Sequence, residues 1–308
     1  MSDRIEIFEV GPRDGLQNER QILSTADKLA LIEGLNASGL TKIEAGAFVR
    51  SDRVPQMADS ESLHSRLKAN GFRGDAYYLV PNMNGLERAV SVGVKQIAVF
   101  TAVSDSFNRK NIGMSVRESL SLIREMTESA RREGIRVRGY VSTVFGCPFE
   151  GRITAHQALP VIEELLSLPV EQVSIGDTIG VASALGVEEV IKPLVSGGSV
   201  PGIAVHFHDT RGTALANALR AFQLGVRTFD SSIGGLGGCP FAPGASGNLA
   251  TEDLVYFFKE MKVETGVDYQ SLCETSLSLL GKMQGRIPSS RALQAYQANC
   301  EKNSVWDS

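Results

Sequence analysis

Short β-branched segments alternate with longer amphipathic segments eight times along the chain, and this alternation constrains the fold more than any other feature. We expect strands at residues 5–11, 42–48, 76–80, 96–103, 136–144, 172–177, 203–208 and 228–233. We expect helices near residues 25–38, 60–70, 84–93, 115–133, 154–168, 184–196, 212–225 and 251–262. Because a helix follows every strand, the strands are expected to pair in parallel through helical crossovers.

Eight strand–helix pairs predict an α/β fold of one particular kind, the closed (β/α)8 (TIM) barrel. The rival is a doubly wound open sheet, but no glycine-rich dinucleotide fingerprint follows the first strand. Such a barrel needs about 250 residues, and the chain has 308. We therefore expect residues 1–264 to form the catalytic barrel and residues 265–308 to form extra C-terminal helices packed on it.

Composition excludes several classes of protein. The net charge of −4 argues against general nucleic-acid binding, which needs a basic surface. No apolar run approaches the roughly 20 residues of a membrane helix, and the N-terminus lacks a signal-peptide pattern. The 4 cysteines are scattered and form no CxxC motif, so a disulfide framework is not expected. Together these features predict a cytoplasmic protein.

Polar residues gather repeatedly at the carboxyl ends of the expected strands. They occupy residues 11–19, Glu44, and residues 105–111, 176–178, 206–209 and 234–248. In a (β/α)8 barrel the active site forms at this end, from the loops that follow the strands. The repeated placement of charged groups beside apolar strands therefore predicts an active site there.

His206 and His208 lie two residues apart on an expected strand, so both side chains share one face. Val205 and Phe207 should then face the helices. Two imidazoles near a carboxylate suit a divalent cation. The alternative is a pair of hydrogen-bonded core histidines. We favour the metal because half of the chain's 4 histidines lie at this strand end.

Three further charged residues have two interpretations each. Asp14 is a candidate third ligand or a turn residue. Arg13 beside it could stabilise a developing negative charge, form an ion pair with a carboxylate such as Glu44, or do both. Asp177 could orient a substrate hydroxyl or cap the following helix.

The glycine-rich segment after the last strand contains two more candidates. Cys239 could donate or accept a proton, although a lone cysteine is usually an inert buried residue. Asn248 offers a neutral oxygen ligand, or it is a turn residue. The mobile glycine context favours a functional thiol.

Four motifs resemble the 3-hydroxy-3-methylglutaryl-CoA (HMG-CoA) lyase family of the DRE-TIM metallolyase superfamily. They are VGPRDGLQNE at 10–19, GDTIG at 176–180, HFHDT at 206–210 and GLGGCPFAPGASGN at 235–248. The resemblance runs from about residue 4 to about residue 298. It implies a divalent-metal-dependent, reverse Claisen-type cleavage of HMG-CoA to acetoacetate and acetyl-CoA, as used in leucine catabolism and ketone-body formation.

The resemblance also implies roles for individual residues. It makes Asp14, His206, His208 and Asn248 the ligands of one Mg²⁺ or Mn²⁺, and it makes Arg13, Asp14, His206 and Cys239 catalytic. It assigns supporting or substrate-binding positions to Gln17, Glu44, Asp177 and Glu252. Arg109 and Lys110 are candidate partners for CoA phosphates, or part of a solvated charged loop. The family suggests a homodimer or a larger homo-oligomer.

Two departures from the family pattern bear on the substrate. Arg211 and Thr213 stand where the parent lyases usually carry Tyr and Gln, and residues 45–47 read Ala-Gly-Ala where small hydroxyl residues are common. A lyase for a longer 3-branched substrate, such as an isohexenyl analogue, is therefore an alternative. A condensing acyltransferase disagrees with the Cys239 loop, and a non-catalytic CoA-ester-binding module disagrees with the intact set of site residues.

Overall fold

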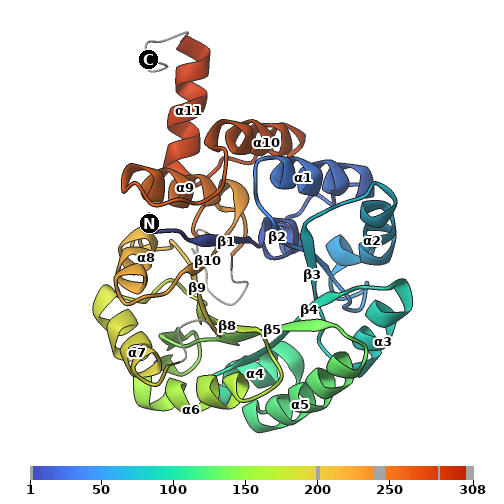
Figure 1. The fold of residues 1–308 in the computed structure, drawn as a ribbon, viewed down its shortest axis with the longest axis vertical. Helices are drawn as coiled ribbons and strands as arrows, with labels where there is room; N and C mark the ends of the chain where they lie inside the picture. Colours follow the sequence, from blue (N-terminus) through green and yellow to red (C-terminus); the bar gives the residue numbers. More distant parts are fainter. Residues whose placement is uncertain (1–2, 199–201, 239–246, 284, 303–308) are drawn as a thin grey trace.

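Eight parallel strands close into a barrel in the order β1-β10-β9-β8-β5-β4-β3-β2, which confirms the expected (β/α)8 fold (Figure 1). The computed structural model describes residues 3–198, 202–238, 247–283 and 285–302. The barrel strands are β1 (Glu6–Glu9), β2 (Lys42–Ala47), β3 (Asp75–Leu79), β4 (Gln96–Ala102), β5 (Arg136–Ser142), β8 (Gln172–Asp177), β9 (Ile203–Phe207) and β10 (Thr228–Ser231).

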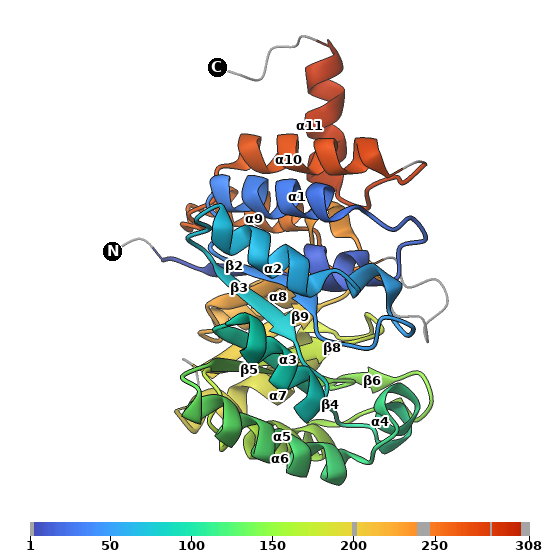
Figure 2. The same ribbon diagram turned by 90° about the vertical axis from the view of Figure 1, so that its right-hand side faces the viewer.

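A ring of helices surrounds the strands, and one large apolar core lies between the two layers (Figures 1 and 2). The ring contains α1 (Thr25–Ala37), α2 (Ser60–Ala69), α3 (Met83–Val92), α5 (Val116–Arg132), α6 (Ala155–Leu166), α7 (Ala184–Ser196), α8 (Ala214–Gln223) and α9 (Thr251–Glu260). In α5 the buried residues Leu120, Ile123 and Ala130 recur at helical spacing, and Ser115 and Glu118 form a capping box. No helix in the described part of the chain is long and apolar enough to cross a membrane.

The segments that follow the strands differ most from expectation. Residues expected as a loop after β4 form a short helix, α4 (Asp105–Ile112), which Ser104 caps and the left-handed Gly113 ends. The strand expected at 5–11 ends at Glu9 and continues as the π-helical turn η1 (Gly11–Gly15). The strand expected at 228–233 ends at Ser231, before the 3-10 turn η4 (Ile233–Gly235). A small hairpin of β6 (Gly146–Cys147) and β7 (Gly151–Arg152) follows β5.

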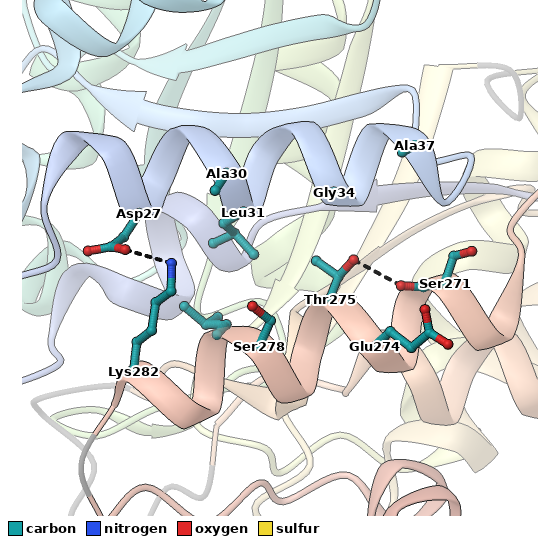
Figure 3. A pocket seen from close by; sticks show the side chains of 11 residues that line it. Asp27, Ala30, Leu31, Gly34, Ala37, Ser271, Glu274, Thr275, Ser278 and Lys282 are labelled. Atoms are coloured by element: carbon teal, nitrogen blue, oxygen red, sulfur yellow. Dashed lines mark hydrogen bonds and ion pairs between the residues drawn. The ribbon is translucent and has the colours of Figure 1, made fainter.

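Two helices, α10 (Tyr269–Lys282) and α11 (Arg291–Lys302), follow the barrel. Helix α10 lies along α1, where Lys282 Nζ and Asp27 Oδ1 are 2.6 Å apart (Figure 3). Gly34 permits this approach, because a Cβ there would lie 2.9 Å from Cγ2 of Thr275. Helix α11 projects away from the body (Figures 1 and 2). The domain boundary after residue 264 stays a prediction.

The inside of the barrel is lined partly by polar groups. Inside the barrel the rings of Phe8 and Tyr77 pack edge to face at 4.9 Å between centroids. Beside the Phe8 ring, Arg138 and Asp230 form an ion pair with side chains that are 0% exposed. The candidate site lies next to this ion pair, at the carboxyl-terminal mouth of the barrel.

Candidate active site

Asp14, His206 and His208 form a cluster in which one possible ligand atom from each lies within 4.8 Å of the others. His206 is on β9, His208 follows that strand, and Asp14 is on the η1 turn after β1. The strand alternation expected from sequence is confirmed, because Val205 and Phe207 belong to the core between strands and helices. The structure thus brings Asp14 to two histidines that lie far from it in the sequence.

Asn248 completes the cluster. It forms an isolated antiparallel bridge with His208, and its Nδ2 donates to Asp14 Oδ2 at 2.8 Å and to the Leu236 carbonyl at 3.0 Å. Asn248 Oδ1 and His208 Nδ1 are buried and have no hydrogen-bond partner among the described residues. Because buried polar atoms are normally paired, these two unpaired atoms fit a ligand set for a hard divalent cation, with His208 in the tautomer that leaves Nδ1 unprotonated.

The electrostatics of the cluster hold His208 and Asp14 in ligand-competent forms, whereas at His206 burial would lower the pKa but the Asp230 carboxylate outweighs it and raises that pKa. Burial, and then the neighbouring His206, lowers the pKa of His208 to about 4, so its imidazole is neutral near pH 7. Burial alone would raise the pKa of Asp14, but Arg13, His206 and His208 outweigh it and hold that pKa below its usual value. A carboxylate and a neutral imidazole are the forms that bind metal ions.

Arg13 lies beside the cluster and is almost fully buried. Its Nε and Nη2 contact Glu44 Oε2 at 2.7 and 2.6 Å, and its Nη1 contacts Asp14 Oδ1 at 2.9 Å. Burial would lower the pKa of Arg13, but the Glu44 and Asp14 carboxylates raise it above the ordinary value. The ion pair with Glu44 is therefore present, and it leaves a permanent positive charge at the edge of the site.

Close packing under the η1 turn explains its glycines. A Cβ on Gly11 would lie 2.5 Å from Glu9 Oε1 and 2.7 Å from Cγ2 of Ile233. A Cβ on Gly15 would lie 2.6 Å from Ser232 Oγ. Only glycine lets this turn sit against the residues that follow β10, and the turn in turn aims Arg13 and Asp14 into the barrel mouth.

A pocket of about 660 Å³ opens from the cluster to the surface. Seven of its lining residues are ones that the sequence singled out: Arg13, Asp14, Gln17, Arg109, Lys110, His206 and His208. Arg109 and Lys110 are exposed on α4, where Arg109 pairs with Asp105 and Lys110 lies 3.7 Å from the centre of the Phe149 ring.

Three of the supporting residues lie outside the pocket wall. Glu44 is behind Arg13. Asp177 accepts hydrogen bonds from the backbone N–H groups of Val181 and Ala182, so its carboxylate organises the loop before α7. Glu252 accepts from the N–H of Gly234 at the start of the glycine-rich segment. Cys239 lies outside the described residues.

Asp230 and Arg138, which the sequence patterns did not single out, lie next to the cluster. Asp230 Oδ2 is 3.3 Å from His206 Nδ1, and Arg138 pairs with the same carboxylate. A charged residue within each of two apolar strands was the available signal. Arg50, Arg53 and Tyr140 also line the pocket, and the sequence offers no comparable pattern for them.

The departures from the family pattern do not line the pocket. The Arg211 guanidinium donates to the carbonyls of Ile179 and Gly180, at 3.0 and 2.8 Å, so it holds the loop after β8. Neither Thr213 nor the Ala-Gly-Ala segment at 45–47 is among the described residues that line the pocket.

The barrel and the site at its carboxyl-terminal mouth define a barrel enzyme with a candidate metal centre. The chain belongs to the HMGL-like family, whose profile matches residues 4–278. It is 44% identical to the mitochondrial hydroxymethylglutaryl-CoA lyase of Bos taurus over 97% of this chain and 90% of the relative.

Two further similarities agree with the family. The chain is 42% identical to a 3-hydroxy-3-isohexenylglutaryl-CoA/hydroxymethylglutaryl-CoA lyase of Pseudomonas aeruginosa, over 96% of this chain and 98% of the relative. The crystal structure of the Bacillus subtilis HMG-CoA lyase superposes with a TM-score of 0.92 at 41% identity, covering 96% of this chain and 98% of that one.

Proposed function

We propose that the protein is a carbon–carbon lyase that cleaves HMG-CoA to acetoacetate and acetyl-CoA. The observation that carries the proposal is the convergence of Asp14, His206, His208 and Asn248 beside the buried Arg13, at the inner end of an open pocket. Membership of the HMGL-like family and the names of the similar lyases support it.

The proposed cofactor is one Mg²⁺ or Mn²⁺ held by Asp14, His206, His208 and Asn248. The two orphaned acceptors, Asn248 Oδ1 and His208 Nδ1, support this assignment. When bound, the cation supplies Lewis-acid chemistry at the tertiary hydroxyl and the free carboxylate of the substrate.

The chain's own residues then accept one proton and stabilise one developing negative charge. As the bond between C2 and C3 breaks, the hydroxyl oxygen loses its proton and becomes the ketone oxygen of acetoacetate. Asp14 and His206 are the two candidate acceptors of that proton. The electron pair of the broken bond moves into the thioester, whose enolate oxygen gains negative charge. Arg13, charged and held in place by Glu44, is positioned to stabilise that oxygen.

The enolate carbon must finally receive a proton to give acetyl-CoA. We assign this transfer to Cys239, whose thiol is the candidate named from the sequence. Glu252 and Asn18 support the segment that leads to it, because Glu252 accepts from the N–H of Gly234 and Asn18 Nδ2 donates to the Gly238 carbonyl at 3.0 Å.

Four cations surround the outer part of the pocket and suit the phosphates of CoA. Arg109 and Lys110 lie on α4, and Arg50 and Arg53 lie in the segment between β2 and α2. All four side chains are exposed, so we expect them to contribute by attracting and orienting an anionic ligand.

A longer 3-branched substrate is the second candidate, because the similar Pseudomonas aeruginosa lyase is named for both isohexenyl and methyl substrates. A panel of 3-branched 3-hydroxyglutaryl-CoA esters, assayed for acetyl-CoA release, tests both candidates. We expect turnover of HMG-CoA that EDTA abolishes and that added Mg²⁺ or Mn²⁺ restores. A higher kcat/KM for the isohexenyl ester would replace the parent substrate, and turnover that survives EDTA dialysis would refute the metal.

The assembly and the cellular location stay predictions. A homodimer or larger homo-oligomer predicts a mass above 33.1 kDa in light scattering coupled to size-exclusion chromatography. For the location, the contents of any organelles or periplasm are first released by osmotic shock and collected as a separate fraction. A cytoplasmic protein should then be recovered in the remaining soluble fraction.

A further inference from the structure

Asp230 lies directly beneath the candidate metal centre, with its carboxylate inside the barrel. It is the register partner of His206 across the β9–β10 pair. Its Oδ2 lies 3.3 Å from His206 Nδ1 and accepts from Ser174 Oγ at 2.7 Å. The Asp230 side chain is completely buried, so no water replaces these contacts at the surface.

Arg138 holds the Asp230 carboxylate in one orientation. Its Nη2 and Nη1 contact the two carboxylate oxygens at 2.5 and 3.2 Å, and its Nε donates to Gln172 Oε1 at 3.1 Å. The guanidinium carbon also lies 3.9 Å from the centre of the Phe8 ring. A fork of this kind fixes both the position and the plane of the carboxylate.

Stability alone does not account for the buried ion pair between Arg138 and Asp230. A buried pair of charges is often no more stabilising than apolar side chains of the same volume, because both charges lose their hydration. The floor of an α/β barrel is usually filled by branched apolar side chains. The contact with His206 gives the pair a second purpose.

An ionised Asp230 can only accept hydrogen bonds, so the His206 Nδ1 that faces it must carry the proton. In the neutral imidazole the Nε2 atom then keeps its lone pair, which is the form that binds a metal ion. With both ring nitrogens engaged in this way, Asp14 rather than His206 is left to accept the hydroxyl proton. His208 is held differently, because its Nδ1 has no partner among the described residues and its backbone pairs with Asn248.

We propose that Asp230 is a positioning residue that fixes the tautomer and ring orientation of His206 so that Nε2 faces Asp14 and His208, and that Arg138 locks Asp230 in this role. The inference rests on the metal site of the proposed function. Carboxylates that orient a ligating histidine typically raise metal affinity by about 10- to 100-fold.

The deciding variant is the double substitution Asp230→Asn/Arg138→Met. Asp230→Asn alone leaves Arg138 buried and unpaired, which strongly destabilises a fold. The double variant removes both charges together, and Met fills apolar space beside the Phe8 ring. Ser174→Ala is the matched control, because it removes a neutral hydrogen bond to the same carboxylate oxygen and keeps the ion pair.

Mn²⁺ binding to the full-length apoprotein, followed by electron paramagnetic resonance without substrate, measures the effect. We expect the double variant to fold, by circular dichroism, and to bind Mn²⁺ about 10- to 100-fold more weakly. Ser174→Ala should keep an affinity close to that of the wild type. Histidine ¹⁵N NMR should show the Nδ1–H tautomer of His206 in the wild type and a growing Nε2–H population in the double variant.

A folded double variant with wild-type Mn²⁺ affinity would overturn the positioning role and leave the metal site intact. A wild-type His206 in the Nε2–H tautomer would overturn it as well. A wild-type protein that binds no Mn²⁺ would instead overturn the metal site itself, and this inference with it. If the double variant does not fold, the tautomer of His206 measured in the wild-type protein decides whether the positioning role holds.

Discussion

Replacing Arg13 with methionine should affect stability and turnover through two separate effects. Arg13 makes a hydrogen bond through Nε and an ion-pair contact through Nη2 to Glu44 Oε2, and Glu44 Oε1 has no partner among the described residues. The Glu44 side chain is 0% exposed. The Arg13→Met variant therefore leaves a buried carboxylate without a directly paired charge, with only the more distant Arg138 still lowering its pKa.

The size of each effect follows from these contacts. Breaking one side of a buried ion pair costs about 3–5 kcal/mol of unfolding free energy. Losing a preorganised donor to a developing oxyanion lowers kcat by about 10²- to 10³-fold. Adding Glu44→Gln to Arg13→Met removes the stranded charge, so the double variant should regain most of the stability and none of the turnover.

Guanidinium denaturation and acetyl-CoA release measure the two effects independently, with Glu44→Gln alone as the control. Arg13→Met with wild-type stability would refute the electrostatic argument. A kcat within tenfold of the wild type, in the stable double variant, would refute the assignment of Arg13 to the reaction.

Three further predictions follow from single contacts. Asn248→Ala removes the hydrogen bond to Asp14 and the unpaired Oδ1 atom, so calorimetry should show that Mn²⁺ binds at least about tenfold more weakly. Unchanged Mn²⁺ binding would remove Asn248 from the ligand set. Gly39→Ala should lower the unfolding free energy by more than about 1 kcal/mol, because its φ is +103° and a Cβ would lie 2.2 Å from a backbone carbonyl oxygen. Gly134→Ala is the matched control, since its φ is +65° and its Cβ would meet nothing within 4 Å, and equal losses would contradict the clash. Burial raises the pKa of Glu9 from 4.5 to about 7; the folded protein therefore holds this proton at a pH where the unfolded chain has released it. The resulting contribution to the unfolding free energy is fully present below pH 4.5 and falls by about 3 kcal/mol as the pH rises to 7. Denaturation curves measured across this pH range should show that Glu9→Gln weakens the dependence of the unfolding free energy on pH.

The fold was predictable because the barrel repeats one simple pattern. The strands are short and largely buried runs of apolar residues, β-branched in most of them, and the helix that follows carries its own apolar stripe, as in α5. Those signals are local and survive in a single sequence. The short helix α4 was missed because its eight residues, Asp105–Ile112, are mostly polar, and its ends depend on Ser104 and Gly113.

Some features of the site likewise follow from local sequence, whereas others depend on closure of the barrel. His206 and His208 share a face by strand alternation, so their pairing follows from sequence alone. Their meeting with Asp14 and Asn248 depends on barrel closure, which brings β1 beside β10 and sets His208 against Asn248. Motif resemblance named these ligands, but spacing along the chain could not have placed residues 14 and 248 within hydrogen-bond distance.

The sequence by itself determined the repeating strand–helix order, the face shared by the two histidines and the chemistry available at the strand ends. The tertiary structure decided how those groups are used. It pairs Arg13 with Glu44, turns Asp177 and Arg211 towards loop backbone, and sets the Arg138–Asp230 pair beneath His206. Local patterns dictate periodicity and side-chain type, whereas a buried charge finds its partner only when distant strands close into one barrel.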